Sequence, residues 1–292
     1  MQYKSYSDLA YDIRSSLHKI PSDIDLVVGV PKSGMIPAMM IGLALNCTTT
    51  GLDGFLEGRL FSHGQTRRHP GQKGHISECR KILIVEDCIS SGVSLENVKK
   101  RIVESSREKN VEQILYMAVY CLSHPEDKVD IYCQKVSPAC FFEWNWPHLW
   151  LLEHSCVDID GVLCIDPTEA QDDDGEQYMR FIEEAPPMYL PKRPINILVT
   201  NRLEKWRTLT KQWLAKHDVR YDQLVMLDLP TVQERAYSGA LDGNHKAKVF
   251  SQSDCLLFIE SSHHQALGIA KQSGKPVLSI EKQVMVYPET VE

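Results

Sequence analysis

One stretch, residues 81–95, constrains the fold of this chain more than any other, and it reads KILIVEDCISSGVSL. Its first part, Lys81 to Val85, is a short apolar, β-branched run, which is typical of a strand buried on both faces. Two acidic residues and a turn of small residues follow, and a helical pattern then begins at Leu95. The stretch therefore predicts a strand, a tight turn and the amino terminus of a helix in direct succession.

This succession predicts an anion site. At a helix amino terminus, unpaired backbone N–H groups and the positive end of the helix dipole face a phosphate, and small side chains let it come close. The adjacent carboxylates of Glu86 and Asp87 suit ribose hydroxyls, or a hydrated Mg²⁺ that travels with a polyphosphate. The alternative interpretation is an ordinary strand-to-helix junction.

The stretch resembles the PRPP-binding signature of type I phosphoribosyltransferases, where PRPP is 5-phosphoribosyl 1-diphosphate. The resemblance implies a catalytic role for Glu86 and Asp87, with Mg²⁺ as cofactor. It also implies that nine consecutive residues bind PRPP: Glu86, Asp87, Cys88, Ile89, Ser90, Ser91, Gly92, Val93 and Ser94. In the 6-oxopurine branch of the family an acidic residue stands where this chain has Ser90. The hypoxanthine or guanine type of acceptor is therefore less supported, and an already anionic or activated base, as in the orotate branch, stays open.

A second strand–loop–helix unit is expected earlier in the chain. Asp25 to Val30 is a short buried strand, and Ile36 to Leu45 continues as an apolar helix. The loop between them should face the same edge of a parallel sheet as the first unit. It resembles the pyrophosphate loop of the family, and the matching residues are Val30, Pro31, Lys32, Ser33 and Gly34.

Between these two units lies a long polar segment, residues 51–79, which is either disordered or a functional lid. The family has a mobile loop here that closes over PRPP and supplies cations to the leaving pyrophosphate. Arg67 and Arg68 are the candidates for that role, with Arg59 and Lys73 behind them. A solvated surface loop is the alternative interpretation.

Aromatic residues are dense in residues 141–148. Because aromatic planes stack on nucleobases, Trp144 and Trp146 are candidates for base binding. The alternative is a hydrophobic seam against a second domain.

A different chemistry is indicated by CVDIDGVL, residues 156–163. Asp158 and Asp160 stand two apart at the end of an apolar run, so their side chains point the same way. One carboxylate can attack a phosphorus while the other handles protons or leaves its carbonyl for a metal. The run resembles motif I of the HAD superfamily, which implies that Asp158 forms an aspartyl-phosphate and that Asp160 is the acid/base.

Three further matches to the HAD superfamily come in order. Thr200 fits the hydroxyl that holds the phosphate, and Lys246 fits the lysine that neutralises it, with Lys248 as a fallback. Glu260 ends a predicted strand, as the metal motif requires. The resemblance implies a Mg²⁺ site made by Asp158, the carbonyl of Asp160 and Glu260. It would be a weak site, because Ser261 stands where a second carboxylate is frequent.

The sequence as a whole predicts an α/β protein with two doubly wound parallel-sheet domains. Residues 1–150 would form a type I phosphoribosyltransferase domain, and residues 151–292 a HAD-like domain with a minimal cap. A first helix is expected from Ser7 to Leu17, with Ser7 as its cap. The net charge of -7 and the pI of about 5.9 disfavour a non-specific nucleic-acid binder. The nine cysteines form no CxxC pair, and no apolar run approaches the length of a membrane span, so a cytoplasmic protein is expected.

The function predicted from these patterns is bifunctional. The first domain would transfer phosphoribosyl from PRPP to a nucleobase-like acceptor and release pyrophosphate. The second would hydrolyse a phosphate monoester, for example the nucleotide just made. Two alternatives stay open: a PRPP- or nucleotide-binding regulator without turnover, and a HAD phosphatase whose first domain is only a specificity cap. No membrane partner is expected, and a homodimer is one assembly that the sequence allows.

Overall fold

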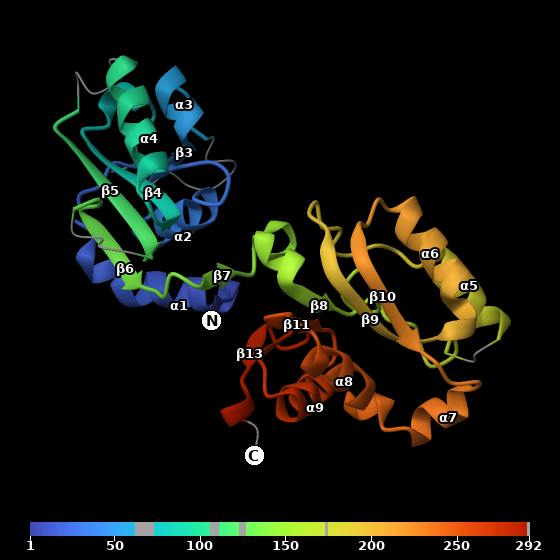
Figure 1. Cartoon of the computed structure of the whole chain (residues 1–292). Coiled ribbons are helices and arrows are strands. Elements are labelled where there is room, and N and C mark those ends of the chain that lie inside the picture. The colour runs from blue at the N-terminus through green and yellow to red at the C-terminus, as the bar shows by residue number, and fades with distance from the viewer. Residues whose placement is uncertain (62–72, 106–110, 123–126, 173–174, 291–292) are drawn as a thin grey trace. The chain divides into compact units, whose positions relative to one another are not determined.

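The structure is a computed structural model that describes residues 1–61, 73–105, 111–122, 127–172 and 175–290. Its internal contacts divide the chain into two compact units, Met1–Cys140 and Phe141–Glu292 (Figure 1). The short strand β7 (Cys140–Phe142) spans the boundary between them. Each unit is described by itself.

The first unit is built on a five-stranded parallel sheet with the strand order β3-β2-β4-β5-β6. The strands of this unit are β1 (Gln2–Lys4), β2 (Leu26–Gly29), β3 (Thr48–Gly51), β4 (Lys81–Ile89), β5 (Gln113–Cys121) and β6 (Ile131–Lys135). Its helices are α1 (Tyr6–Ser16), α2 (Met35–Leu45), α3 (Leu52–Glu57) and α4 (Val93–Glu104), with short 3₁₀ turns η1 (Leu17–Lys19) and η2 (Ile76–Glu78).

Both faces of this sheet are covered by helices. Alternate residues of β2 and β4, among them Val28 and Ile84, form a core with Phe55 of α3 and Ile102 of α4. The helix α2 contacts the same two strands, and Gly29 of β2 lies against the backbone of Met35 in this helix. Burial on both faces explains why β2 and β4 are nearly continuous apolar runs.

The strand order places the predicted anion site at a crevice. The strands β2 and β4 are neighbours, although β3 comes between them in the sequence. The chain leaves β2 toward one edge of the sheet and leaves β4 toward the other. In open α/β sheets, ligands bind outside the carboxyl ends of the strands at such a switch point. The loop 30–34 and the turn 90–92 both start at this edge.

Two local predictions in this unit were wrong. The strand β4 does not end at Val85 but continues to Ile89, because β5 pairs with it as far as Ile89 and Cys121. The helix α1 is capped by Ser5, not by Ser7. The Ser5 hydroxyl accepts the Asp8 N–H at 3.1 Å, and the Asp8 carboxylate accepts the Ser5 N–H at 2.8 Å, which together make a capping box.

The second unit contains a six-stranded sheet with the strand order β10-β9-β8-β11-β12-β13. Its strands are β8 (Ser155–Val157), β9 (Ile195–Leu203), β10 (Tyr221–Leu227), β11 (Leu257–Glu260), β12 (Val277–Ser279) and β13 (Val284–Val286). Its helices are α5 (Glu176–Glu184), α6 (Arg207–Lys216), α7 (Val232–Tyr237), α8 (Asn244–Gln252) and α9 (His263–Ser273). Its 3₁₀ turns are η4 (Trp146–His148), η5 (Trp150–His154), η6 (Glu204–Trp206), η7 (Ala240–Asp242) and η8 (Pro288–Thr290).

All strand pairs of this sheet are parallel except β12 with β13. The helices α8 and α9 bury Phe250 and Ile269 against the sheet, while α5 packs on α6. The indole N–H of Trp213 in α6 donates to the carbonyl of Ala185 at 2.8 Å. The first strand of the unit, β8, is central, so its carboxyl end is again a switch point.

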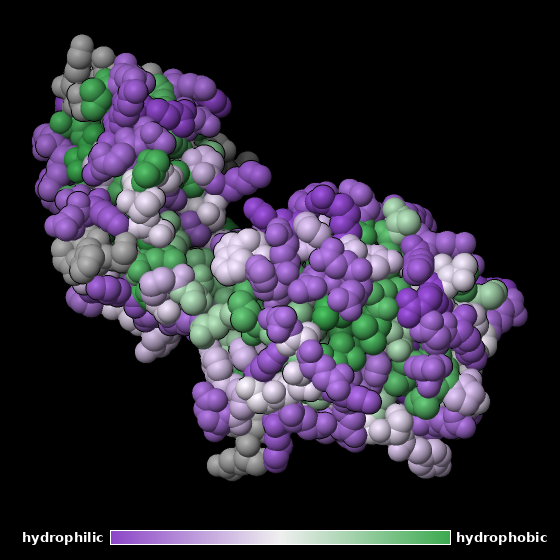
Figure 2. All heavy atoms as spheres, viewed as in Figure 1, coloured by the Kyte–Doolittle hydropathy of each residue, from purple (hydrophilic) through white to green (hydrophobic). Residues whose placement is uncertain are grey.

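On each unit, the visible surface is mostly hydrophilic, and groups of hydrophobic residues lie among the hydrophilic ones (Figure 2). Over the described residues, none of the helices has the length and apolar character that a membrane span requires.

Candidate functional site

In the first unit, the loop after β2 and the end of β4 are in direct contact. The Ser33 hydroxyl donates to the Asp87 carboxylate at 2.7 Å, and the Val30 N–H donates to the Val85 carbonyl at 2.9 Å. A methyl group at Gly34 would stand 2.6 Å from the Val85 carbonyl oxygen, so only glycine fits there. The structure therefore brings the predicted pyrophosphate loop and the acidic pair to one place.

The acidic pair itself is buried, with Glu86 and Asp87 each 6% exposed. Glu86 accepts a hydrogen bond from the Ser94 hydroxyl at 3.0 Å. Burial raises the pKa of Glu86 to about 7, the charge of Asp87 adds to this, and the hydrogen bond from Ser94 opposes it. A carboxyl group with this pKa changes its charge near neutral pH. A bound hydroxyl donor or cation can therefore select its ionised form.

The turn after β4 ends on Gly92, whose φ of +87° lies in the left-handed region that favours glycine. The helix α4 starts at Val93, earlier than the predicted start at Leu95. The left-handed conformation of Gly92 completes the turn, so the next residue is already helical. Ser94 is thus within the first helical turn, where its hydroxyl reaches Glu86. The amino terminus of α4 is presented at the carboxyl end of β4, as an anion site requires.

Sequence reasoning missed one cation at this turn. The Lys128 ammonium donates to the Ser90 carbonyl at 2.6 Å, and its side-chain stem lies 3.3 Å from where a methyl group at Gly92 would stand. Lys128 lies just before β6, far from the turn in the sequence, and no motif marks it.

The cations predicted for the lid have different outcomes. Arg67 and Arg68 lie outside the described residues. Arg59 forms an ion pair with Glu57, and the Lys73 ammonium is 3.6 Å from the Asp25 carboxylate. Arg59 also lines an open pocket of about 360 Å³ that includes Pro31 of the predicted pyrophosphate loop. A role for these four residues stays a prediction.

The two tryptophans proposed for base binding belong to the second unit by their contacts. Trp146 is 3% exposed, and its ring centroid lies 5.1 Å from that of Tyr189. A buried ring packed in this way cannot be reached by a base, so for Trp146 the hydrophobic interpretation replaces base stacking. Trp144 stacks on Phe142 with centroids 4.9 Å apart, and its proposed contact with a base stays a prediction.

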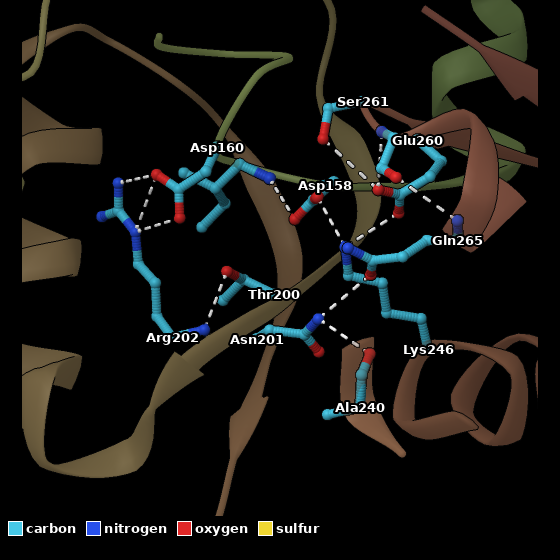
Figure 3. Close-up of polar contacts among 12 residues, drawn as sticks. Asp158, Asp160, Thr200, Asn201, Arg202, Ala240, Lys246, Glu260, Ser261 and Gln265 are labelled. Atoms are coloured by element: carbon cyan, nitrogen blue, oxygen red, sulfur yellow. Dashed lines mark hydrogen bonds and ion pairs between the residues drawn. The ribbon is translucent and has the colours of Figure 1, made fainter. Parts of the chain in front are cut away.

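The second unit has its own polar centre at the switch point of its sheet (Figure 3). Asp158 directly follows β8, Glu260 ends β11, and Lys246 reaches the same point from α8. The Lys246 ammonium donates to Asp158 at 2.6 Å and to Glu260 at 2.8 Å. All three residues are at most 4% exposed. Lys246 therefore occupies the predicted position, while Lys248 is exposed.

The electrostatics of this centre follow from its burial. Burial raises the pKa of Asp158, the Glu260 charge adds to this, and the Lys246 ammonium opposes it. Burial acts to lower the pKa of Lys246, but the two carboxylates outweigh it and hold that pKa above its usual value. The centre is thus a pair of buried carboxylates whose charges one buried lysine partly compensates.

Two other predicted residues have defined partners. The Asp160 carboxylate points away from Asp158 and accepts N–H groups of Arg202 at 2.6 and 3.0 Å (Figure 3). Thr200 lies within β9 rather than at its end, is 1% exposed, and its hydroxyl accepts the Arg202 N–H at 3.2 Å.

The metal site predicted here fits the side chains poorly. Among the described residues, no three histidine, cysteine, aspartate or glutamate side chains are grouped so that they could hold a metal ion. Asp158 and Glu260 instead share the Lys246 ammonium, and the other Glu260 oxygen accepts the Ser262 N–H at 3.2 Å. We therefore route no step through a metal at this centre.

Three residues near this centre were given no role from the sequence. Arg202 follows Thr200 directly but carries no motif of its own. Asn201 donates to the Ala240 carbonyl and to Gln265, both at 3.1 Å, while its buried amide oxygen has no partner among the described residues. Asp166 comes close to Gly161 and Ser261, and only its place shortly after the DIDG run could have drawn attention to it.

Comparison with known proteins decides the family. The sequence model of the phosphoribosyl transferase domain family matches residues 3–150. The chain belongs to this family. The phosphoribosyltransferase domain thus contains the loop 30–34 and the acidic pair described above. The match ends at residue 150, so the interpretation of the Asp158 centre depends on its geometry alone. None of the curated proteins compared with this chain matches it.

Several solved structures are similar to the phosphoribosyltransferase domain. A xanthine-guanine-hypoxanthine phosphoribosyltransferase from Helicobacter pylori is 16% identical, with a TM-score of 0.37, over 50% of this chain and 93% of its own. A purine phosphoribosyltransferase from Pyrococcus horikoshii is 17% identical, with a TM-score of 0.34, over 49% and 94%. An orotate phosphoribosyltransferase from Aeropyrum pernix is 15% identical, with a TM-score of 0.29, over 45% and 71%. Identities and scores this low transfer no acceptor to this chain.

Proposed function

We propose that the phosphoribosyltransferase domain transfers ribose 5-phosphate from PRPP to a nucleobase-like acceptor and releases pyrophosphate. The observation that carries this proposal is the hydrogen bond from Ser33 to Asp87, which joins the loop after β2 to the acidic pair at the end of β4. The diphosphate and the ribose are covalently joined in PRPP, so the loop that would bind the diphosphate and the carboxylates that would bind the ribose must lie side by side.

Each part of PRPP has a matching group at this edge of the sheet. The backbone N–H groups of the turn and the amino terminus of α4 suit the 5-phosphate. Glu86 and Asp87 suit the ribose hydroxyls, and the loop 30–34 suits the diphosphate. As the bond to the diphosphate breaks, positive charge develops on the ribose, and the two carboxylates stabilise it. Mg²⁺ would arrive with the diphosphate as part of the substrate, because two carboxylates and one hydroxyl are too few protein ligands for a site of its own.

The first experiment measures PRPP binding and pyrophosphate release separately, with Mg²⁺ and a panel of bases. Asp87→Asn removes the charge while it keeps the shape, and we expect it to lower pyrophosphate release by at least tenfold. Binding of PRPP without release of pyrophosphate for any base would instead support the regulator. If PRPP does not bind at all, the proposal is wrong.

A glycine pair gives a matched control. A methyl group at Gly34 would meet the backbone carbonyl oxygens of Val30 and Val85 at 2.7 and 2.6 Å, so Gly34→Ala must displace the loop from β4. A methyl group at Gly51 would have the Met35 sulfur as its nearest neighbour, at 3.3 Å. Because this sulfur belongs to a flexible side chain, it can move aside in Gly51→Ala. We expect Gly34→Ala to weaken PRPP binding strongly and Gly51→Ala to leave it nearly unchanged.

A second function is favoured by the Asp158 centre. We propose that Asp158 attacks the phosphorus of a phosphate monoester and forms an aspartyl-phosphate, which water then hydrolyses. The support is the buried Lys246 ammonium at 2.6 Å from Asp158, because it opposes the effect of burial on the Asp158 carboxylate and can neutralise the incoming phosphate. The test is trapping of phosphorylated protein, which should be lost in Asp158→Asn.

The two activities together suggest sequential use. The nucleotide made in the first step would lose its 5′-phosphate in the second, which would make the reversible transfer effectively one-way. With PRPP, Mg²⁺ and the accepted base, inorganic phosphate should then appear after pyrophosphate. Pyrophosphate without phosphate would reject the coupling. Loss of pyrophosphate release in Asp158→Asn would instead favour a phosphatase whose first domain is only a specificity cap.

A further inference from the structure

The carboxylate of Asp160 is held by a buried guanidinium. The Arg202 side chain is 0% exposed, and its Nη2 and Nε atoms lie 2.6 and 3.0 Å from the two Asp160 oxygens. Hydrogen bonds between a guanidinium and a carboxylate on two atoms each are strong and fix the orientation of both groups. The Asp160 carboxylate is therefore engaged by Arg202 and directed away from Asp158, which makes it poorly placed to meet a leaving group.

Another carboxyl group stands at the same centre. Gly161 has a φ of +71°, and a methyl group there would overlap both the Asp166 carboxylate and the Ser261 side chain. The Asp166 carboxylate therefore lies against Gly161, on the same side of this glycine as Ser261, the residue that follows Glu260. Asp166 makes no hydrogen bond and no ion pair within the part of the chain that the structure describes.

The surroundings of Asp166 favour its protonated form. Partial burial raises the pKa of Asp166, the charges of Asp160 and Glu260 raise it further, and Lys246 opposes them. At the same time Asp166 is open to solvent on one side, so protons can reach it. These are the properties of a general acid, and Asp160 has neither a free carboxylate nor this exposure.

We infer that Asp166, rather than Asp160, is the proton-transfer group of the Asp158 centre. This inference rests on the phosphatase function proposed above. As the Asp158 oxygen bonds to phosphorus, the bond from phosphorus to the ester oxygen breaks. The proton of Asp166 goes to that oxygen and an alcohol leaves. Water then attacks the aspartyl-phosphate and gives its proton to Asp166. Inorganic phosphate leaves, and both carboxyl groups return to their starting forms.

Asp160 is a positioning residue, because its carboxylate holds the turn in place through the hydrogen bonds from Arg202.

The experiment compares two phosphate monoesters on the full chain: ribose 5-phosphate, whose alkoxide needs a proton to leave, and p-nitrophenyl phosphate, whose leaving group does not. Asp166→Asn should lower kcat for the alkyl ester by roughly 10²- to 10⁴-fold and for the aryl ester by less than about tenfold. Asp166→Glu should recover part of the loss. Asp222→Asn is the matched control, because Asp222 is exposed near the amino end of β10, away from the carboxyl edge of the sheet.

The outcomes separate the inference from the function on which it rests. Equal losses on both esters in Asp166→Asn would mean a structural role and would overturn the inference. A selective loss on the alkyl ester in Asp160→Asn, with Asp166→Asn active, would overturn it in favour of Asp160. If the unaltered protein hydrolyses neither ester, or if Asp158→Asn hydrolyses both, the phosphatase function itself is wrong.

Discussion

At the scale of single residues, Lys246 decides what two buried carboxylates can do. Its ammonium is the shared partner of Asp158 and Glu260, and none of the three side chains is appreciably exposed. Replacement of the lysine would leave two uncompensated charges in a site that excludes water, which is far more costly than loss of a surface ion pair.

We predict that Lys246→Met destabilises the second unit by about 3–5 kcal/mol, because it removes the charge that compensates both carboxylates. All five tryptophans lie in residues 144–213, so their fluorescence during urea denaturation reports on this unit. Lys248→Met, on the same helix and exposed, is the control and should stay within about 0.5 kcal/mol of the unaltered protein. Equal effects of the two variants would contradict the proposed charge balance.

Glu86 makes a pH-dependent contribution in the first unit. Its pKa is about 7 in the folded protein against 4.5 for an ordinary glutamate. Between these values the folded state holds a proton that the unfolded state has released. The stabilisation is therefore fully present below about pH 4.5 and is lost as the pH rises to about pH 7. At about 1.4 kcal/mol per pKa unit, the loss is on the order of 3 kcal/mol.

Glu86→Gln should remove this pH dependence, because glutamine keeps the hydrogen-bond acceptor for Ser94 and does not titrate. Hydrogen exchange of the β4 amides measures the opening free energy of that strand. The difference between the variant and the unaltered protein should grow with pH across the window given above. Parallel curves for the two proteins would show that Glu86 is not buried as described.

At the scale of elements, local capping and strand pairing set where the helices and strands begin and end. The first helix illustrates this, since both Ser5 and Ser7 are plausible caps by residue type alone. Ser5 is the cap because the carboxylate of Asp8 reaches back to its N–H group and completes the capping box.

We predict that Ser5→Ala lowers the free energy of unfolding of the first unit by about 1 kcal/mol, because an N–H group at the helix start loses its acceptor. Ser7→Ala, at an exposed position of the first turn, should change it by less than about 0.5 kcal/mol. Far-UV circular dichroism during denaturation follows both variants. A larger effect at Ser7 would restore the cap predicted from the sequence.

At the scale of the whole molecule, one chain carries two centres, each at the switch point of its own parallel sheet. The phosphoribosyltransferase domain supplies the first, with Glu86 and Asp87. The second, with Asp158, has a different set of charged groups. Because the two centres share no residue, substitutions should separate the two activities proposed for them.

We predict that Asp87→Asn lowers pyrophosphate release and leaves hydrolysis of an added phosphate monoester unchanged, while Asp158→Asn has the reverse effect. Each activity is measured alone, with its own substrate, so that supply of the nucleotide does not couple the assays. Both variants should keep the melting behaviour of the unaltered protein in the unit that was not altered. Loss of both activities in either variant would mean that the centres are not independent.

The sequence by itself determined most of what depends on short-range order. Short continuous apolar runs and small-residue turns predicted the strand–turn–helix units around Gly34 and Gly92, and the motif order pointed to Asp158, Lys246 and Glu260. These signals lie within a few residues, where backbone geometry and residue type act directly. The acidic pair that ends near the switch point and the family could therefore be inferred without coordinates.

Only the tertiary structure decided which distant side chains meet and which are covered. It buried Trp146 against Tyr189, tied Asp160 to Arg202, and brought Lys128 to Ser90 and Asp166 to Gly161. These contacts join segments that no periodic pattern links, because the burial and partners of a side chain depend on how helices and sheets pack over one another. The charges that result, on Glu86 and at the Asp158 centre, follow from that packing and not from residue type.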